Sequence, residues 1–309
     1  MLPVIKAFFS MLLLFSVFCF APNSVFASMT STTYQIQWDT IGPGGSDTSS
    51  SSSYRLRDSI GNGLDGLSSS GSYRLDAGYR AGIYDPTVYF NLFSQNMNSQ
   101  VGATSLASTT VGVSTTSGYS VGDYIVIVQD EGLSQVTAMG RITAVGGSSL
   151  TVDFLSDGGT SPTIDGTGDY VYELSSTTLP LTTLSSTTAS TGVVGWDVTA
   201  DVPSGYGMYV VEDTDLQASG GSPVITDVAD GAVTLGSIEY GARSSDTSLA
   251  SSTFDTQDTA FTTQLQQIGS RSAVSFKSRD FITLKAAVDA TIANGTYSQT
   301  LTFVFVGNY

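Results

Sequence analysis

The feature that most constrains the fold of this chain is its repetition of short apolar runs separated by Gly, Ser, Asp and Pro. Residues 124–128 and 150–154, for example, are rich in β-branched and aromatic side chains and are bounded by turn-forming residues. Runs of this length with such boundaries are typical of β-strands. Helical spacing of apolar residues occurs in one stretch, residues 256–268, whose Thr content and flanking Ser suit a strand or a loop at least as well. The sequence therefore predicts an all-β protein.

The composition removes whole classes of active site. The chain has 309 residues, no His, one Cys, 11 Lys and Arg and 27 Asp and Glu, so its formal net charge is −16. Without His, the nucleophile systems Ser-His-Asp and Cys-His, His-ligated zinc and His-ligated haem are all excluded. The acidic balance argues against a nucleic-acid partner, because phosphates are held mainly by Lys and Arg. Carboxylates are the general acid–base groups that the chain has in quantity.

The first residues have the pattern of a secretory signal peptide. Lys6 precedes an apolar run over residues 7–21. In the segment Val25-Phe26-Ala27 that follows, positions −3 and −1 of a cleavage site are occupied by a β-branched and a small residue, Val25 and Ala27. We expect residues 1–27 to be removed, which discards Cys19 and leaves no Cys in the mature chain. No later apolar stretch is long enough to span a membrane as a helix, so we expect a secreted or cell-surface protein.

Residues 28–86 form the first of three predicted modules. Tyr34, Tyr54 and Tyr73 recur at spacings of 20 and 19 residues, and each is followed two positions later by an aliphatic residue on the same strand face. The connecting residues 41–45, 49–53 and 68–72 are rich in Gly and Ser, which predicts turns and loops. These repeats are too short to bury an apolar face alone, so we expect them to pack on one another or on a neighbour.

Residues 87–176 are predicted to form a small β-barrel. Strands are expected at residues 124–128, 138–145, 150–154 and 169–173, and Gly146-Gly147-Ser148 reads as a hairpin turn between two of them. Short strands joined by tight Gly turns are typical of small barrels.

Residues 177–309 are predicted to form an immunoglobulin-like β-sandwich, because strand candidates recur there with turns between them. The last candidate covers residues 300–306, where Leu301, Phe303 and Phe305 alternate with residues that are themselves largely apolar. A strand that is apolar on both faces is expected between two neighbours. It would lie centrally in its own sandwich or against another subunit.

Several segments resemble parts of exported proteins. Residues 53–83 (SYRLRDSIGNGLDGLSSSGSYRLDAGYRAGI) resemble an N-terminal Tyr/Gly repeat of uncharacterised exported bacterial surface proteins, and residues 117–123 are similar to the entry of small barrels in surface and phage-fibre-like proteins. Residues 225–243 look like part of a surface β-sandwich. Residues 294–300 and the strand LTFVFVGNY that follows are similar to the end of fimbrial and spore-coat-like subunits. The resemblance implies a location and an architecture, and it carries over no catalytic residue.

Two kinds of chemistry are open to the acidic residues. Glu212-Asp213-Thr214-Asp215 is the densest group and could supply the carboxylate pair of a glycosidase. Calcium, which takes oxygen ligands, is a second use of acids in turns. The metal candidates that follow are Asp213, Asp215, Asp227 and Asp230, with a further loop containing Asp157, Asp165 and Asp169. None of these acids has the spacing of an EF-hand, and ordinary Asp-Gly turns are the simpler explanation of them.

These observations predict a non-enzymatic, secreted or cell-surface structural or adhesion protein, with an appendage component as one form of it. We expect no cofactor, apart from calcium at the acids named above, and partners that are other copies of the chain, surface proteins or glycans. Two alternatives remain open, a glycan-binding module and a carboxylate-dependent glycan hydrolase.

Overall fold

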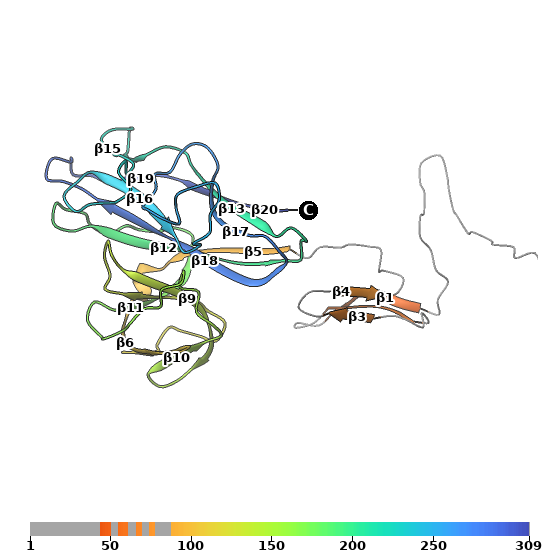
Figure 1. Cartoon of the computed structure of the whole chain (residues 1–309). Coiled ribbons are helices and arrows are strands. Elements are labelled where there is room, and N and C mark those ends of the chain that lie inside the picture. Colours follow the sequence, from red (N-terminus) through yellow and green to blue (C-terminus); the bar gives the residue numbers. More distant parts are fainter. Residues whose placement is uncertain (1–43, 51–54, 61–65, 70–73, 78–87, 309) are drawn as a thin grey trace, which may run out of the picture. The chain divides into compact units, whose positions relative to one another are not determined.

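The computed structural model describes residues 44–50, 55–60, 66–69, 74–77 and 88–308. The chain divides into two compact units, residues 1–85 and residues 86–309 (Figure 1). The regular elements of the described residues are strands, apart from one short 3-10 turn, η1 (Met97–Ser99), so the predicted all-β class is confirmed. No helix in these described ranges is long and apolar enough to cross a membrane.

The first unit contains two antiparallel hairpins within its described residues. In one, β1 (Gly44–Ser50) pairs with β2 (Arg55–Ile60), and in the other, β3 (Gly66–Ser69) pairs with β4 (Arg74–Ala77). Strands β2 and β4 begin directly after two of the repeated tyrosines, which lie outside the described residues, as do the predicted leader 1–27 and the third tyrosine.

Part of the turn prediction in this unit was wrong. Gly44, Gly45, Ser49 and Ser50 were expected in connecting segments, but they lie in β1 and are paired with β2. Pairing across a hairpin satisfies the backbone groups whatever the side chains are, so the Gly and Ser content did not prevent a strand here.

In the second unit, six antiparallel strands close into a barrel, as predicted. Around the barrel their order is β6 (Val101–Ala107), β7 (Thr110–Val113), β10 (Ser149–Val152), β9 (Val136–Val145), β8 (Tyr124–Gln129) and β11 (Tyr170–Ser176). Strand β11 closes the ring, because it pairs with β8 on one side and with β6 on the other. Buried aliphatic side chains fill the interior, among them Val111, Ile125, Ile127 and Leu150.

A glycine lets the barrel curl tightly. The predicted hairpin turn at residues 146–148 joins β9 to β10, and the register shifts between Thr151 and Val152 where β9 bends. At Gly140, on the same bend, an added Cβ would lie 2.8 Å from the Cβ of Val152. A larger residue at Gly140 would therefore push the two strands apart.

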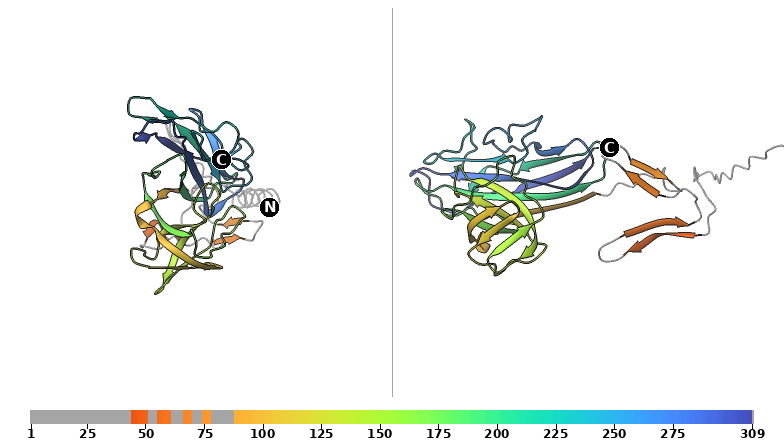
Figure 2. Two further views of the ribbon diagram at one scale, coloured as in Figure 1. Left: turned by 90° about the vertical axis from the view of Figure 1, so that its left-hand side faces the viewer. Right: turned by 60° about the horizontal axis from the view of Figure 1, so that its bottom comes forward.

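Two further sheets pack face to face and form a sandwich (Figures 1 and 2). The strands of the first sheet are, in order, β16 (Glu239–Ser244), β18 (Ser275–Ala287), β12 (Ser190–Ala200) and β5 (Val88–Gln95). The strands of the second are β17 (Gln266–Arg271), β13 (Tyr206–Glu212) and β20 (Leu301–Gly307). A small third sheet contains β15 (Val224–Ile225), β14 (Leu216–Ala218) and β19 (Tyr297–Ser298). Buried aromatic residues fill the core between the sheets, including Trp196, Tyr206, Tyr240, Phe254 and Phe261.

Two strands differ in position from the sequence-based expectation. Strand β5 was grouped with the barrel, but it pairs with β12 of the sandwich from Val88 to Ser94 and reaches β11 of the barrel only at Ser94 and Gln95. The local sequence of a strand does not specify a partner that is about a hundred residues away. The predicted barrel module, which began at residue 87, therefore included β5, although β5 belongs to a sandwich sheet.

The central position considered for the last strand was wrong. Among the described residues, β20 pairs with β13 alone, over seven consecutive positions, and it therefore forms the edge of its sheet.

The barrel packs against the outer face of the first sandwich sheet. Val193 of β12 and Phe281 of β18 point toward Met139, Tyr172 and Leu174 of the barrel. Gly195 permits the close approach, since a Cβ there would lie 2.7 Å from the sulfur of Met139. These buried contacts make residues 88–308 one compact unit.

A buried arginine fixes the same interface by charge. The side chain of Arg279, on β18, is 1% exposed. Its Nη1 and Nη2 atoms donate to the two carboxylate oxygens of Asp153, beyond β10, at 2.6 and 2.8 Å, and its Nε donates to Asp197 of β12 at 2.6 Å. The guanidinium also lies over the rings of Tyr124 and Phe154, 5.2 and 4.4 Å from their centroids. One side chain thus binds both the barrel and the sandwich.

Replacing this arginine should destabilise the whole unit. We expect Arg279→Met to reduce the free energy of unfolding by about 3–5 kcal/mol, because Asp197 would stay buried without its counter-ion. Arg243→Met, at an exposed position on β16 of the same sheet, is the matched control and should change it by less than about 0.5 kcal/mol. Urea denaturation followed by tryptophan fluorescence measures both variants. Equal losses in the two would show that the Arg279 ion pairs do not hold the interface.

Candidate functional site

Three carboxylates meet at one end of the sandwich. Glu212 ends β13, Asp215 precedes β14, and Asp227 follows β15. The pairing of Leu216 with Ile225 between β14 and β15 brings the last two acids together. One oxygen from each of the three residues lies within 4.8 Å of the others. We call Glu212, Asp215 and Asp227 the acidic cluster.

The four predicted metal candidates divide into two pairs. Asp215 and Asp227 belong to the acidic cluster. Asp213 is exposed, and its Oδ1 accepts a hydrogen bond from the backbone amide of Thr300 at 2.8 Å, which lowers its pKa. Asp230 is also exposed, and its Oδ1 accepts from the backbone amide of Ala232 at 3.1 Å. Asp213 and Asp230 therefore hold backbone turns, as Asp does in loops generally.

The second predicted group of acids is used in the same way. Asp157 accepts from the amide of Gly159, and Asp165 accepts from that of Thr167. Asp169 is buried and accepts from the amides of Asp130, Asp165 and Gly166 at 2.8–3.0 Å. The structure does not bring these three carboxylates together as one set of ligands.

Proximity and burial keep the acidic cluster partly protonated near neutral pH. Burial, followed by the charges of Asp227 and Asp215, raises the pKa of Glu212 to about 7. Burial and the charge of Asp215 raise the pKa of Asp227 to about 6. No Lys or Arg among residues 88–308 forms an ion pair with these acids. Within this described range the cluster is therefore a concentration of acidic groups without a basic counter-ion.

Two buried oxygen atoms at the cluster have no hydrogen-bond partner. Gln299, between β19 and β20, donates from Nε2 to Glu212 at 2.9 Å, but its Oε1 is buried and accepts no hydrogen bond. The Oδ1 atom of Asp227 is buried and unpartnered as well. Carboxylate and amide oxygens are the ligands that calcium prefers, and it takes about six to eight of them. The arrangement can supply part of such a coordination shell. Gln299 carried no signal in the sequence that could have identified it.

The geometry does not suit the glycosidase interpretation of residues 212–215. A glycosidase places its two carboxylates on either side of the scissile bond in an open cleft, about 5–5.5 Å apart in retaining enzymes. The oxygen atoms of the acidic cluster lie within 4.8 Å of one another, close to that separation, but Glu212 is only 6% exposed, so a polysaccharide has little access to its carboxylate.

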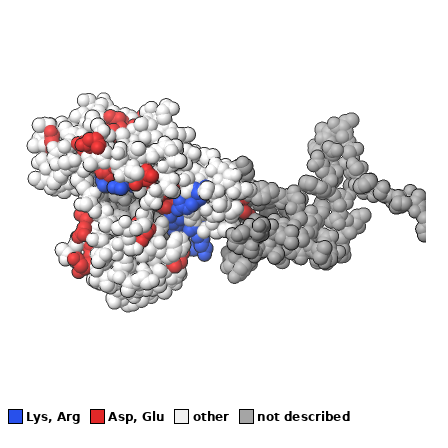
Figure 3. Space-filling model, in the orientation of Figure 1, with Lys and Arg blue, Asp and Glu red and all other residues white. Residues whose placement is uncertain are grey.

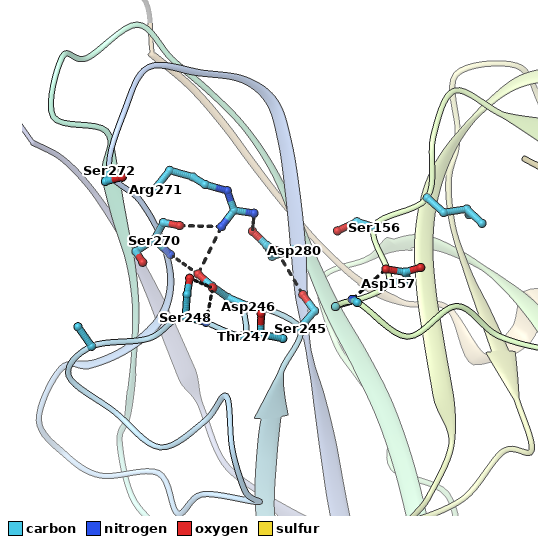
Figure 4. Close-up of a pocket in the computed structure, with 14 residues that line it drawn as sticks. Ser156, Asp157, Ser245, Asp246, Thr247, Ser248, Ser270, Arg271, Ser272 and Asp280 are labelled. Atoms are coloured by element: carbon cyan, nitrogen blue, oxygen red, sulfur yellow. Dashed lines mark hydrogen bonds and ion pairs between the residues drawn. The ribbon is translucent and has the colours of Figure 1, made fainter.

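A separate pocket of about 790 Å³ lies between a barrel loop and two sandwich loops (Figure 4). Its walls carry polar side chains, among them Ser156 and Asp157 on the barrel side and Ser248, Asp246 and Asp280 on the sandwich side. Arg271 reaches between the two sandwich acids, with Nη1 3.3 Å from Asp246 and Nη2 2.7 Å from Asp280. Sequence reasoning did not identify this pocket.

The carboxylates of this pocket are already bound. Asp246 also accepts hydrogen bonds from the amides of Ser248 and Ser270. Burial raises the pKa of Asp280 to about 6, although Arg271 opposes this shift. The residues that line the pocket include no aromatic side chain on which a sugar could stack.

Stability should depend on pH through the acidic cluster. The native pKa values of Glu212 and Asp227, about 7 and about 6, exceed the usual values of about 4.3 and 3.9. The folded state therefore binds more protons than the unfolded state between about pH 4 and pH 7. The contribution of Glu212 and Asp227 to the free energy of unfolding consequently falls as the pH rises through that window. We expect Glu212→Gln to weaken the fall in melting temperature between about pH 5 and pH 8.

Calcium provides a second measurement on the same variants. Millimolar calcium at about pH 8 should raise the melting temperature of the unaltered chain but not that of Glu212→Gln. Asp230→Asn, a surface acid outside the cluster, is the control and should keep both the pH dependence and the calcium effect. A calcium effect that survived in Glu212→Gln would contradict binding at this cluster.

The geometry and chemistry of the chain are the basis for judging its function. No protein-family model, curated protein or solved structure matches the chain.

Proposed function

We propose that this chain is a non-enzymatic, exported structural protein of the cell surface. The observation that carries the proposal is that the buried acids outside the acidic cluster are held by ion pairs or backbone amides, since carboxylates are the chain's only plentiful acid–base groups. Asp197 is bound to Arg279, Asp246 and Asp280 are bound to Arg271, and Asp258 is bound to Lys285 at 2.7 Å. Buried carboxylates in such contacts stabilise a fold and are not free to transfer protons to a substrate.

The proposed location depends on the sequence. The order of a basic residue, an apolar run and the exit Val25-Phe26-Ala27 supports export. The resemblance of residues 53–83 to a Tyr/Gly repeat of exported surface proteins supports a place at the cell surface. An all-β chain whose mature part lacks Cys must obtain its stability from packing and ion pairs, and the barrel–sandwich interface supplies both.

The two alternatives receive no specific support from the pocket beside Arg271. A hydrolase would need Asp246 and Asp280 as a free acid and base, but both are held by one guanidinium. A lectin site would benefit from an aromatic platform, and none lines the pocket.

Export can be tested by the mass of the protein that is recovered outside the cell. We expect protein recovered from outside the cell to begin at Ser28 by intact mass, and the variant Ala27→Arg to keep its leader because the cleavage site needs a small residue. Exported protein that retained residues 1–27, or that stayed inside the cell, would contradict the proposed location.

The purified mature chain should release no reducing sugar from a panel of polysaccharides. Release of sugar that disappeared in Asp246→Asn or Asp280→Asn would establish the hydrolase instead. Binding on a glycan array without turnover would establish the lectin.

A further inference from the structure

The sandwich has one open side, where both of its sheets end in an edge strand. Strand β20 ends the second sheet, and β5 ends the first sheet over most of its length. The rings of Phe90 on β5 and Phe305 on β20 stack across this side, with centroids 5.7 Å apart. The two edges therefore lie one above the other.

The backbone of β20 has a free row of hydrogen-bonding groups. The amide of Asp213 donates to the carbonyl of Thr300, and the amide of Asn308 donates to that of Gly205. The backbone amides and carbonyls of the even-numbered residues of β20 thus point toward β13. Because these groups alternate in direction along an antiparallel strand, those of the odd-numbered residues 301–307 point outward, away from the sheet. Strand β20 has no strand partner on that side among residues 88–308. On β5, by contrast, Ser94 and Gln95 already pair with β11.

Neither edge has the protection that sheet edges normally carry. Of the seven strands in the two main sheets, β5 (VYFNLFSQ) and β20 (LTFVFVG) are the two without a charged residue. Charges, Pro and bulges are the usual means of preventing a strand edge from pairing with another chain. The ladder between β20 and β13 also runs without a register shift.

The side chains at this edge are incompletely covered. Leu301, Phe303 and Phe305 point toward the sandwich core but are only half-buried. On the outer face, Val306 is 42% exposed and Thr302 is exposed. A further strand beside β20 would complete the burial of the inward residues.

The distribution of charge on the chain indicates which protein supplies the additional strand beside β20. The formal charge of −16 makes copies of this chain repel one another over most orientations. Acidic groups are spread over the face shown in Figure 3, whereas β20 and β5 carry none. Because β20 and β5 bring no charge of their own to the contact, a second copy that approaches along these strands meets no like charge on them. The strand that it requires, apolar inward and uncharged outward, is one that β20 of another copy supplies.

We propose that two copies of the chain pair through β20 in antiparallel fashion around a two-fold axis. With the axis at Val304, Phe303 lies opposite Phe305 of the other copy, and Leu301 lies opposite Gly307. This register matches odd residues with odd residues, so the free amides and carbonyls of both strands are satisfied together. The second sheet of one copy then continues into that of the other, with cross-strand phenylalanine pairs facing the joined core.

This pairing deepens the proposed structural role by naming a partner, and its test in solution is independent of export and of sugar turnover. Light scattering on mature protein, residues 28–309, should show a monomer that becomes a dimer as concentration rises. In the double variant Thr302→Lys/Val306→Lys, the substituted side chains lie directly opposite each other across the axis, so we expect a folded monomer. Its melting temperature should match that of the unaltered chain at concentrations where the unaltered chain is monomeric. Val121→Lys, a 65% exposed position on the barrel, is the control and should still dimerise.

Two results specific to the register complete the test. Mixing the lysine double variant with Thr302→Glu/Val306→Glu should restore a heterodimer, because opposite charges then face each other. Val304→Cys, in a mature chain without other Cys, should form a disulfide-linked dimer on oxidation, since residues opposite in a non-hydrogen-bonded pair lie about 4.5 Å apart at Cα. Val121→Cys should not. A monomer at every concentration, or a dimer that persists in the lysine double variant, would overturn the proposal.

Discussion

The buried guanidinium of Arg279 is the contact on which the arrangement of the larger unit depends. It satisfies one carboxylate from the barrel and one from the sandwich, and two aromatic rings shield it from water. Burial opposes its positive charge, but Asp153 and Asp197 outweigh that effect and raise the pKa of Arg279. In the same contact, hydrogen bonds from Arg279 lower the pKa of Asp153 despite its burial. Arg279 and Asp153 therefore favour each other's charged form, and this contact exists only while the barrel and the sandwich are held together.

Most of the buried charge in this unit follows the same logic, and the acidic cluster is the exception. Arg271 and Lys285 neutralise buried acids elsewhere, but Glu212, Asp215 and Asp227 have no such partner within residues 88–308. Glu212 pairs in the ladder with Leu301, the first residue of β20, and Gln299 lies just before it. Binding of protons or of a cation at the cluster would therefore change the charge beside the first residue of the edge strand β20. The acidic cluster and the edge strand β20 are therefore neighbours in the structure.

What the sequence could predict depended on how local the signal was. Four of the barrel strands, β8 to β11, were predictable from their apolar runs and from the turn at residues 146–148, which act between segments that are close in the chain, whereas β6 and β7 were not identified. The sheet of β5 was not predictable, because its partner β12 is remote and its own residues fit either module. Asp215 and Asp227 were each identifiable as acids in turns, but only the pairing of β14 with β15 joins them. The sequence left β20 either central in its own sheet or against another subunit, because an apolar strand normally lies between two neighbours; the structure gives it a single neighbour in the described chain.

Hydrogen exchange tests most directly whether the barrel and the sandwich are one structural unit. Amides of β8 and β11 in the barrel and of β12 and β18 in the sandwich can be followed by mass spectrometry in increasing, sub-denaturing guanidinium. If Arg279 and the apolar contacts around Met139 and Phe281 hold the two parts together, the slowest amides of all four strands will exchange with the same free energy and the same denaturant dependence. Barrel strands that exchanged through a separate opening of lower free energy, while β12 and β18 stayed protected, would contradict this account.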